Sequence, residues 1–212
     1  MNFINLTRKC WGRFLTILYH HQYKNIKRSS SVYYSAHVYN PDNLYMEENT
    51  NIDGGATIMN GRAKFIMKKW SGAAINLLVI TGNHMSVVGK SLKQITDKTK
   101  EQLDINHEMD KDIVVDEDVW IAARVTLLSG THLGRGCEVG SGSVIRGNVP
   151  PYAVVIGNPG KVVGFRFTPE EVIEHEKKLY PEAERMPKEL LDKNYEKYFL
   201  RRIKDIQQLI KL

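Results

Sequence analysis

The feature that most constrains this chain is a repeat of six residues in its second half. Steps of six from residue 115 meet only aliphatic side chains: Val115, Ile121, Leu127, Leu133, Val139 and Ile145. Steps of six from residue 119 meet only small or β-branched ones: Val119, Val125, Thr131, Cys137 and Ser143. A period of six fits neither the 3.6-residue repeat of a helix nor simple strand alternation. It predicts a parallel β-helix of short strands, with one residue in six pointing into a narrow core.

A second, less regular row extends this pattern upstream. It runs through Met46, Ile52 and Ile58 and, after a slip of two residues, through Ile66, Gly72 and Leu78. Glycines fall between the aliphatic positions downstream, where corners would need positive φ: Gly134, Gly136, Gly140, Gly142 and Gly147. Each inward aliphatic side chain contributes about 1.5–3 kcal/mol when buried. The two rows together therefore predict one continuous core.

Residue composition and the spacing of apolar residues divide the 212 residues into three parts. Residues 1–35 are basic and carry helical spacing at Phe14, Ile17 and Leu18. Residues 36–167 hold the predicted β-helix, with 85–112 as a long inserted loop. Residues 168–212 are predicted to be helical, opening with a capping box at Thr168-Pro169-Glu170-Glu171. Pro187 is expected to begin a second helix with a single apolar stripe: Leu191, Tyr195, Phe199, Ile203, Ile206 and Ile210.

Composition and charge narrow the class of protein. No apolar run is long enough to span a bilayer, and the run at residues 14–19 lacks the cleavage site of a signal peptide. Two cysteines are too few for a disulfide framework, which favours a reducing, cytoplasmic compartment. The net charge of +6 lies mostly in clusters without nucleic-acid motifs, so we expect no nucleic-acid partner. The basic N-terminal segment is expected to cap the solenoid; a subunit contact or a membrane carrying a lipid-linked sugar are the alternatives.

Motifs along the repeat add a second kind of information. They are Ile80-Thr81-Gly82-Asn83-His84, Glu117-Asp118-Val119-Trp120-Ile121, Val139-Gly140-Ser141-Gly142-Ser143-Val144, Val149-Pro150-Pro151-Tyr152-Ala153 and Gly157-Asn158-Pro159-Gly160-Lys161-Val162. In this order they resemble the hexapeptide-repeat acyltransferase family, in its branch of sugar and polysaccharide O-acetyltransferases close to the xenobiotic and galactoside/maltose acetyltransferases. The resemblance implies a mainly β fold with a left-handed β-helix, acetyl-CoA as co-substrate and no metal. It also implies a homotrimer with active sites between subunits, acting on a small-molecule or glycan acceptor.

His84 is the candidate catalytic residue. It follows a predicted strand at the point where the solenoid opens into the inserted loop, and imidazole exchanges protons near neutral pH. In the family that the motif resembles, the matching histidine is the general base that deprotonates the acceptor hydroxyl. Cys137 lies on the row of small residues and is predicted to be packed, and Cys10 has no expected role. Direct transfer without an acyl-enzyme is therefore expected.

The resemblance places the cofactor along the later coils. Trp120 is expected to point outward, either into a subunit interface or as a wall of the site. Backbone N–H groups near Ala122 and Ala123 are expected to polarise the thioester carbonyl. The family usually has Gly where this chain has Ala122. The remaining positions that match cofactor contacts are Ser141, Gly142, Arg146, Lys161 and Arg166. Their basic members suit the phosphates of coenzyme A.

Acceptor recognition is the least constrained part. Asp53, Asn60 and Asn83 are polar residues on coils near His84 and are candidate partners for sugar hydroxyls, with a role in turns as the alternative. The same base would serve an N-acyltransferase acting on an amino sugar. A non-catalytic scaffold that binds a partner is a further alternative. A zinc-dependent carbonic anhydrase of the same fold is disfavoured, because the sequence has no close pair of histidines within the repeat.

Overall fold

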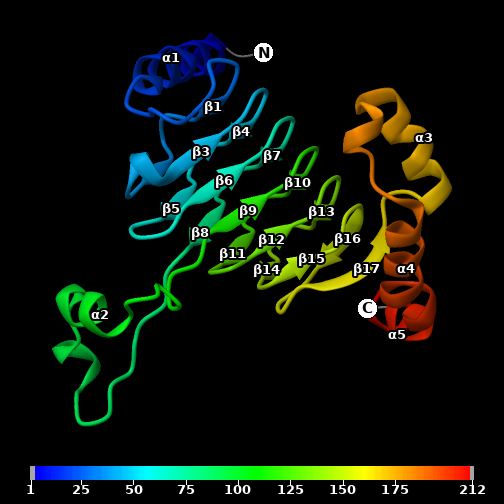
Figure 1. Ribbon diagram of the computed structural model, residues 1–212. Coiled ribbons are helices and arrows are strands. Elements are labelled where there is room, and N and C mark those ends of the chain that lie inside the picture. Colours follow the sequence, from blue (N-terminus) through cyan, green and yellow to red (C-terminus); the bar gives the residue numbers. More distant parts are fainter. Residues whose placement is uncertain (1–2, 211–212) are drawn as a thin grey trace.

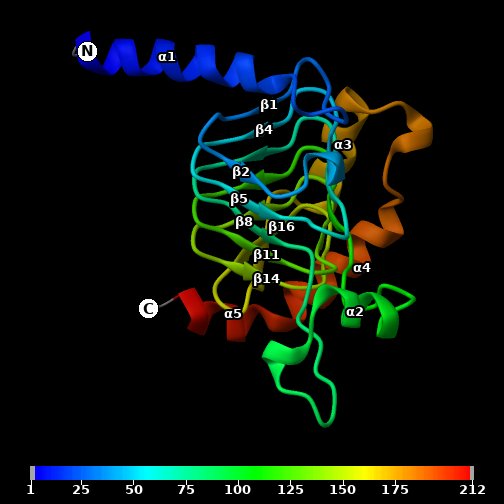
Figure 2. The same ribbon diagram turned by 90° about the vertical axis from the view of Figure 1, so that its left-hand side faces the viewer.

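The computed structural model describes residues 3–210, and three parallel sheets form the walls of a β-helix (Figures 1 and 2). In spatial order, sheet 1 contains β1 (Ser31–Val32), β4 (Asn51–Ile52), β7 (Gly72–Ala73), β10 (Trp120–Ile121), β13 (Glu138–Val139), β16 (Ala153–Ile156) and β17 (Lys161–Phe165). Sheet 2 contains β14 (Val144–Ile145), β11 (Thr126–Leu128), β8 (Leu78–Ile80), β5 (Thr57–Met59) and β2 (His37–Val38). Sheet 3 contains β15 (Asn148–Val149), β12 (His132–Leu133), β9 (Ile113–Val115), β6 (Phe65–Met67) and β3 (Leu44–Met46). Only β17 pairs antiparallel among these strands, so the chain winds in one direction until its last coil.

The six-residue row of the second half is confirmed. Val115 pairs with Leu133, three steps of six further along, and Leu127 pairs in the same way with Ile145. Every member of the aliphatic row is at most 2% exposed, and every member of the row of small residues is at most 1% exposed. The core is thus a column of side chains stacked coil upon coil between the three sheets.

The upstream row was wrong by one residue after Ile58. Met67, Ala73 and Val79 point inward and pair with the first three members of the downstream row, whereas Ile66 and Leu78 are only half-buried. The corner that follows β5 is longer than expected, so the slip is three residues. A shift by one residue exchanges the two faces of a strand, which is why the predicted side chains lie on the outer face.

The corners confirm only part of the glycine prediction. Gly136 and Gly142 adopt φ values of +68° and +72°, which a side chain would strain. Gly134 and Gly140 do not have positive φ. Gly134 serves close packing instead, because a Cβ there would lie 2.7 Å from the backbone nitrogen of Pro151.

The C-terminal extension is helical, as predicted. It contains α3 (Pro169–Leu179), η3 (Glu182–Glu184), α4 (Lys188–Tyr198), η4 (Leu200–Arg202) and α5 (Ile203–Ile210). The capping box is present, since Thr168 accepts from the Glu171 amide while the Glu171 carboxylate accepts from the Thr168 amide. The single stripe was wrong, because the helix ends at Phe199. The turn there puts Leu191 and Ile206 on separate helices, and both are buried.

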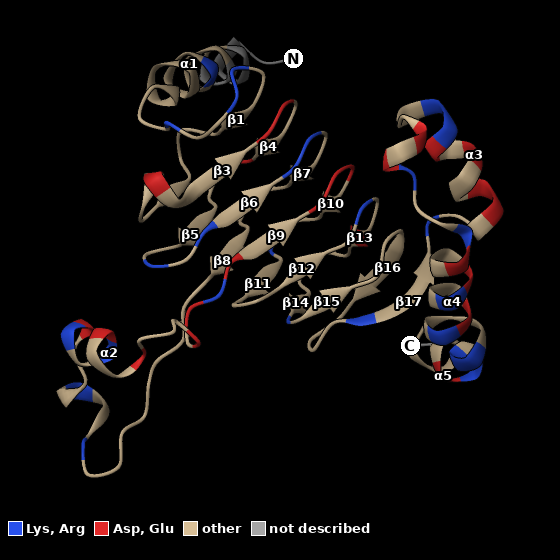
Figure 3. Cartoon of the chain, viewed as in Figure 1, with Lys and Arg blue, Asp and Glu red and all other residues tan. Residues whose placement is uncertain are grey.

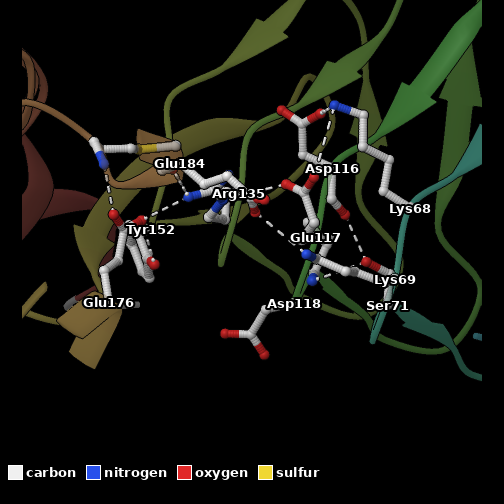
Figure 4. A network of polar contacts seen from close by, with 12 residues as sticks. Lys68, Lys69, Ser71, Asp116, Glu117, Asp118, Arg135, Tyr152, Glu176 and Glu184 are labelled. Carbon is white, nitrogen blue, oxygen red and sulfur yellow. Dashed lines mark hydrogen bonds and ion pairs between the residues drawn. The ribbon is translucent and has the colours of Figure 1, made fainter. Parts of the chain in front are cut away.

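Charges of alternating sign stack along the corner between sheets 3 and 1 (Figure 3). From coil to coil the corner carries Glu47, then Lys68, then Asp116 and Glu117, then Arg135. Lys68 Nζ lies 2.7 Å from Asp116, and Arg135 Nε lies 3.2 Å from Glu117 (Figure 4). Ion pairs therefore tie the coils from Lys68 to Arg135 outside the apolar core, and Glu47 joins the row by accepting from the Lys69 amide at 3.0 Å.

This ladder continues into the C-terminal helices through Glu176 of α3. The side chain of Glu176 is almost fully buried and accepts hydrogen bonds from the Tyr152 hydroxyl at 2.9 Å and from Arg135 at 3.1 Å (Figure 4). The Met186 amide donates to its other oxygen at 2.6 Å. Burial, together with the neighbouring Glu176 charge, raises the pKa of Tyr152. This buried network fixes α3 on the last coils.

Two elements leave the body of the β-helix. The segment between β8 and β9 carries η2 (Leu92–Gln94) and α2 (Asp97–Leu103) away from the coils (Figure 1). α1 (Phe3–His20) lies beside the first coil and extends past its edge (Figure 2). A short turn, η1 (Pro41–Asn43), precedes β3. None of the helices within residues 3–210 has the length and apolar character needed to cross a membrane.

Candidate active site

The segment after β8 is shaped to hold His84 at the base of the insertion. Thr81 is buried, and its hydroxyl donates to the Met59 carbonyl at 3.2 Å. Gly82 allows the Asp110 carboxylate to approach, since a Cβ at this position would collide with it. The side-chain amide of Asn83 donates to the Met109 carbonyl at 3.1 Å, which closes the two ends of the insertion. Thr81, Gly82 and Asn83 thus each make a contact that holds the segment leading to His84 in place.

The imidazole of His84 is exposed and makes no hydrogen bond to any other residue between 3 and 210. It lies at the rim of a cavity of about 210 Å³, with Ile95, Thr96 and Lys100 on the wall formed by the insertion. A free imidazole beside a cavity is available for proton transfer to or from a bound molecule. Its geometry is that of an uncommitted base rather than a structural histidine.

A charged cluster under the insertion was not predicted from the sequence. Asp110 is 7% exposed, and its carboxylate lies 2.6 Å from Lys100 Nζ and 3.4 Å from Arg62 Nε. Lys100 also donates to the Asn83 carbonyl at 2.8 Å, one residue before His84. A second cavity of about 290 Å³ adjoins the first and shares Asp97 and Lys100 as lining residues. Lys100 and Asp110 both belong to the insertion, whereas Arg62 comes from the segment between β5 and β6, so spacing in the sequence gives no signal for the cluster.

The three predicted acceptor residues have different surroundings. Asn60 is fully buried, and its side chain bonds both the amide and the carbonyl of Asn40, so it holds two coils together and is not free to contact a sugar. The amide of Asn83 is likewise used within the insertion. Asp53 lies at the corner between sheets 1 and 2, where it accepts from Asn51 at 3.2 Å. The fold does not bring Asp53 and His84 together within one chain.

The two backbone amides predicted to contact the thioester, at the corner after β10, differ in their hydrogen bonding. The Ala122 amide donates to the Val139 carbonyl at 2.9 Å, so it is occupied by the ladder between coils. The Ala123 amide has no partner in the described part of the chain. Trp120 points outward and is 49% exposed, and its ring covers Gly72, where a Cβ would lie 3.2 Å from it. The free Ala123 amide and the exposed Trp120 ring thus belong to the same short segment of the chain.

The predicted phosphate contacts divide into free and occupied cations. Arg146 and Lys161 are exposed, and neither forms an ion pair with a residue in the range 3–210. Both lie within two residues of the hydrogen bond from the Gly160 amide to the Val144 carbonyl, at the C-terminal end of the β-helix. Arg166 was expected to be available too, but its guanidinium lies 2.7 Å from the Asp118 carboxylate. Its Nε also lies 3.7 Å from the Glu138 carboxylate, so Arg166 is already ion-paired within the fold.

Ser141 and Gly142 lie one coil beyond Ala123 at the same corner. The Gly142 amide donates to the Ala123 carbonyl at 3.0 Å, and Ser141 is exposed. The residues that follow Ala123 on the next coil at this corner are therefore small.

His84 and Ala123 lie at opposite ends of the strands of sheet 2, at two different corners of the β-helix. Ala123 precedes the strands of this sheet and His84 follows them, so at ~3.3 Å per residue they are separated by roughly 15–20 Å. One chain alone does not place the candidate base beside the candidate thioester donor.

Of the two free cysteines, Cys10 is exposed and Cys137 is buried. Cys137 is fully buried, and burial raises the pKa of its thiol, so it is packed as predicted. His107 bonds Arg62 at 2.8 Å and His132 bonds Asp116 at 2.8 Å. Within residues 3–210 there is no group of three histidine, cysteine or acidic side chains placed to hold a metal.

Comparison with known proteins supplies the context for this site. A family model described as bacterial transferase hexapeptide (six repeats) matches residues 112–147, which include the confirmed six-residue rows. This stretch of the chain therefore carries the hexapeptide repeat of these transferases. A probable macrolide acetyltransferase of Lysinibacillus sphaericus is 33% identical over 51% of this chain and 56% of its own length. A putative lipopolysaccharide biosynthesis O-acetyl transferase of Escherichia coli is 37% identical over 34% of this chain and 33% of its own.

Solved structures of hexapeptide-repeat transferases share the fold. An acetyltransferase of Vibrio cholerae in complex with acetyl coenzyme A superposes with a TM-score of 0.53 at 19% identity, over 79% of this chain and 80% of that one. The N-acyltransferase AntD of Bacillus cereus superposes with a TM-score of 0.57 at 13% identity, over 76% of this chain and 92% of that one. The matched part of the chain spans less than two thirds of the length of these curated relatives.

Proposed function

We propose that this hexapeptide-repeat protein is an acetyl-CoA-dependent O-acetyltransferase acting on a hydroxyl of a sugar or polysaccharide precursor. In this proposal residues 36–167 form the transferase domain and wind in the left-handed sense that the family resemblance implies. The free imidazole of His84 at the rim of a cavity carries the proposal. The fold shared with an acetyltransferase complexed with acetyl coenzyme A and the relatives named as acetyltransferases support it.

In the proposed reaction, His84 accepts the proton of the acceptor hydroxyl as that oxygen attacks the thioester carbonyl. A carbon–oxygen bond forms and the carbon–sulfur bond breaks, and the proton passes from His84 to the departing thiolate. The Ala123 amide stabilises the negative charge on the carbonyl oxygen. Trp120 flanks the pantetheine arm, Ser141 and Gly142 line its path, and Arg146 and Lys161 contact the phosphates.

The proposed enzyme is a homotrimer with its active sites between subunits. The separation of His84 from Ala123 across sheet 2 supports this arrangement, because a neighbouring copy would supply the missing half of each site. The acceptor would then enter beside the insertion, where the Asp110 cluster fixes the base of the loop.

Calorimetric titration with acetyl-CoA tests the donor, and product analysis with sugar acceptors tests the reaction. We expect micromolar binding near one site per chain, and a drop in kcat of roughly 10²–10⁴-fold in His84→Ala with donor affinity retained. His132→Ala is the matched control, because this histidine is 47% exposed and bonds Asp116 of the charged row between sheets 3 and 1, not the insertion. Absence of binding at millimolar acetyl-CoA would contradict the proposal and favour a non-catalytic scaffold.

An N-acyltransferase acting on an amino sugar is the second candidate. It is favoured by the shared fold of AntD, whose structure was determined with dTDP and 3-hydroxybutyryl-CoA. Supplying matched acceptors that differ only in a hydroxyl or an amine at one carbon separates the two, since the acylated atom identifies the class.

A further inference from the structure

α1 is attached to the β-helix by the side of the helix that carries its small residues. Gly12 is buried against Tyr33, and a Cβ at Gly12 would collide with the Tyr33 hydroxyl. One turn later, the Thr16 hydroxyl accepts a hydrogen bond from the Tyr34 amide at 3.2 Å. Residues four apart lie on one face of a helix, so this face is the docked one.

The apolar face of α1 points away from the protein. Trp11, Phe14, Ile17 and Leu18 follow helical spacing and are 62%, 54%, 75% and 50% exposed. The rings of Trp11 and Phe14 stack with their centroids 5.5 Å apart. A surface helix normally buries its apolar stripe and exposes its polar one, and here the two are reversed. Figure 2 shows the N-terminal part of α1 extending beyond the coils.

The charge of the whole protein originates in this part of the chain. Residues 1–41 contain no Asp or Glu and six basic residues: Arg8, Lys9, Arg13, Lys24, Lys27 and Arg28. That equals the net charge of +6 of the full chain, so residues 42–212 are balanced. Lys24 and Lys27 lie near Asp42 and Glu48, but these exposed pairs contribute little and remain open to competition.

An apolar helix face within a basic, acid-free segment fits an anionic lipid surface. Aromatic and aliphatic side chains enter the boundary between headgroups and acyl chains, while Lys and Arg attract anionic headgroups. A second copy of α1 would instead bring equal positive charges together. We propose that α1 binds in the plane of an anionic lipid bilayer, with Trp11, Phe14, Ile17 and Leu18 inserted.

Flotation of the full-length protein with vesicles tests the proposal. The probes are vesicles of phosphatidylcholine alone and of phosphatidylcholine mixed with phosphatidylglycerol. We expect at least tenfold stronger partitioning to the anionic vesicles, weakening at high salt because the charges are screened. Ile17→Glu should lower this partitioning at least tenfold, since it replaces an inserted apolar side chain with an anion. Ile105→Glu is the matched control, because Ile105 has the same exposure of 75% in the insertion, and it should partition like the unaltered protein.

A second readout identifies the inserted surface. Lipids brominated in the acyl chains should quench Trp11, and Trp11→Phe should remove most of the quenching although Trp70 and Trp120 remain. Equal partitioning of Ile17→Glu and Ile105→Glu, or quenching unchanged in Trp11→Phe, would overturn the proposal. So would a lower oligomer mass for Ile17→Glu in light scattering without vesicles, because this face would then belong to a contact between copies of the chain.

Discussion

At the scale of single residues, the candidate site depends on which polar groups are left free. The His84 ring, the Ala123 amide and the Arg146 and Lys161 side chains have no partner in the part of the chain that the structure describes. Asn60 and Arg166 have the residue types expected of ligand contacts, but the fold uses both for its own contacts. The hydrogen bonds and ion pairs within the fold therefore distinguish candidates that residue type alone does not distinguish.

Gly82 gives a prediction at this scale. In Gly82→Ala the new methyl group displaces the Asp110 carboxylate, and Asp110 then loses its contact with Lys100. We expect kcat/KM to fall roughly tenfold or more, because the support of His84 shifts, while thermal stability changes little. Gly61→Ala is the control, since a Cβ there meets nothing within 4 Å. Equal activity of the two variants would show that the approach of Asp110 is irrelevant to the site.

Tyr152 gives a prediction about pH. Burial and Glu176 raise its pKa in the folded protein, whereas the unfolded chain ionises at its ordinary value of about 10. The folded state therefore keeps a proton that the unfolded state loses, so stability falls as pH rises above about 10. In Tyr152→Phe we expect a loss of about 1.5–3 kcal/mol at pH 8, from the lost hydrogen bond to a charged group, and a shallower decline above pH 10. Urea unfolding between pH 8 and pH 11 measures both, and parallel curves for the two proteins would refute the linkage.

At the scale of elements, the same capping chemistry serves two different purposes. Thr168 caps α3, which the buried Glu176 ties to the last coils. Thr96 caps α2, which belongs to the insertion and has no buried residue. One helix is part of the cooperative structure, and the other is part of a loop beside the candidate site.

These two caps predict different consequences for the same substitution. Thr168→Ala should lower the free energy of unfolding by about 1 kcal/mol, because the first turn of α3 loses its side-chain acceptor. Thr96→Ala should leave global unfolding unchanged and instead speed amide exchange within the insertion. A melting temperature lowered equally in both variants would show that the insertion is part of the cooperative core.

At the scale of the whole molecule, the position of the insertion matters more than its sequence. It leaves the corner after sheet 2, whereas the free Ala123 amide lies at the corner before sheet 2. A triangular solenoid keeps such corners apart by the width of one sheet, however many coils it has. An active site that needs both corners requires a second chain.

Hybrid oligomers test this requirement. His84→Ala and Lys161→Glu should each be nearly inactive alone, the first lacking the base and the second repelling coenzyme A from the Ala123 side, since Lys161 pairs with Ile156 at the end of sheet 1. Unfolding and re-forming them together should restore part of the activity, because some interfaces then combine an intact His84 with an intact cofactor side. Recovery would not occur if both halves of the site came from one chain, and the two proteins mixed without exchange serve as the control.

The sequence by itself determined the β-helix, the place of the insertion and the motif around His84. A repeat of six with stacked aliphatic residues has one way to bury them, so local pattern was sufficient there. The register from β6 to β8 was missed, because one added corner residue reverses the faces of a strand without changing the composition. The Asp110 cluster, the free Ala123 amide and the outward apolar face of α1 were decided only by the tertiary structure. Each depends on contacts between segments that the fold brings together. Such contacts do not produce a periodic pattern in the sequence, so they could not be predicted from it.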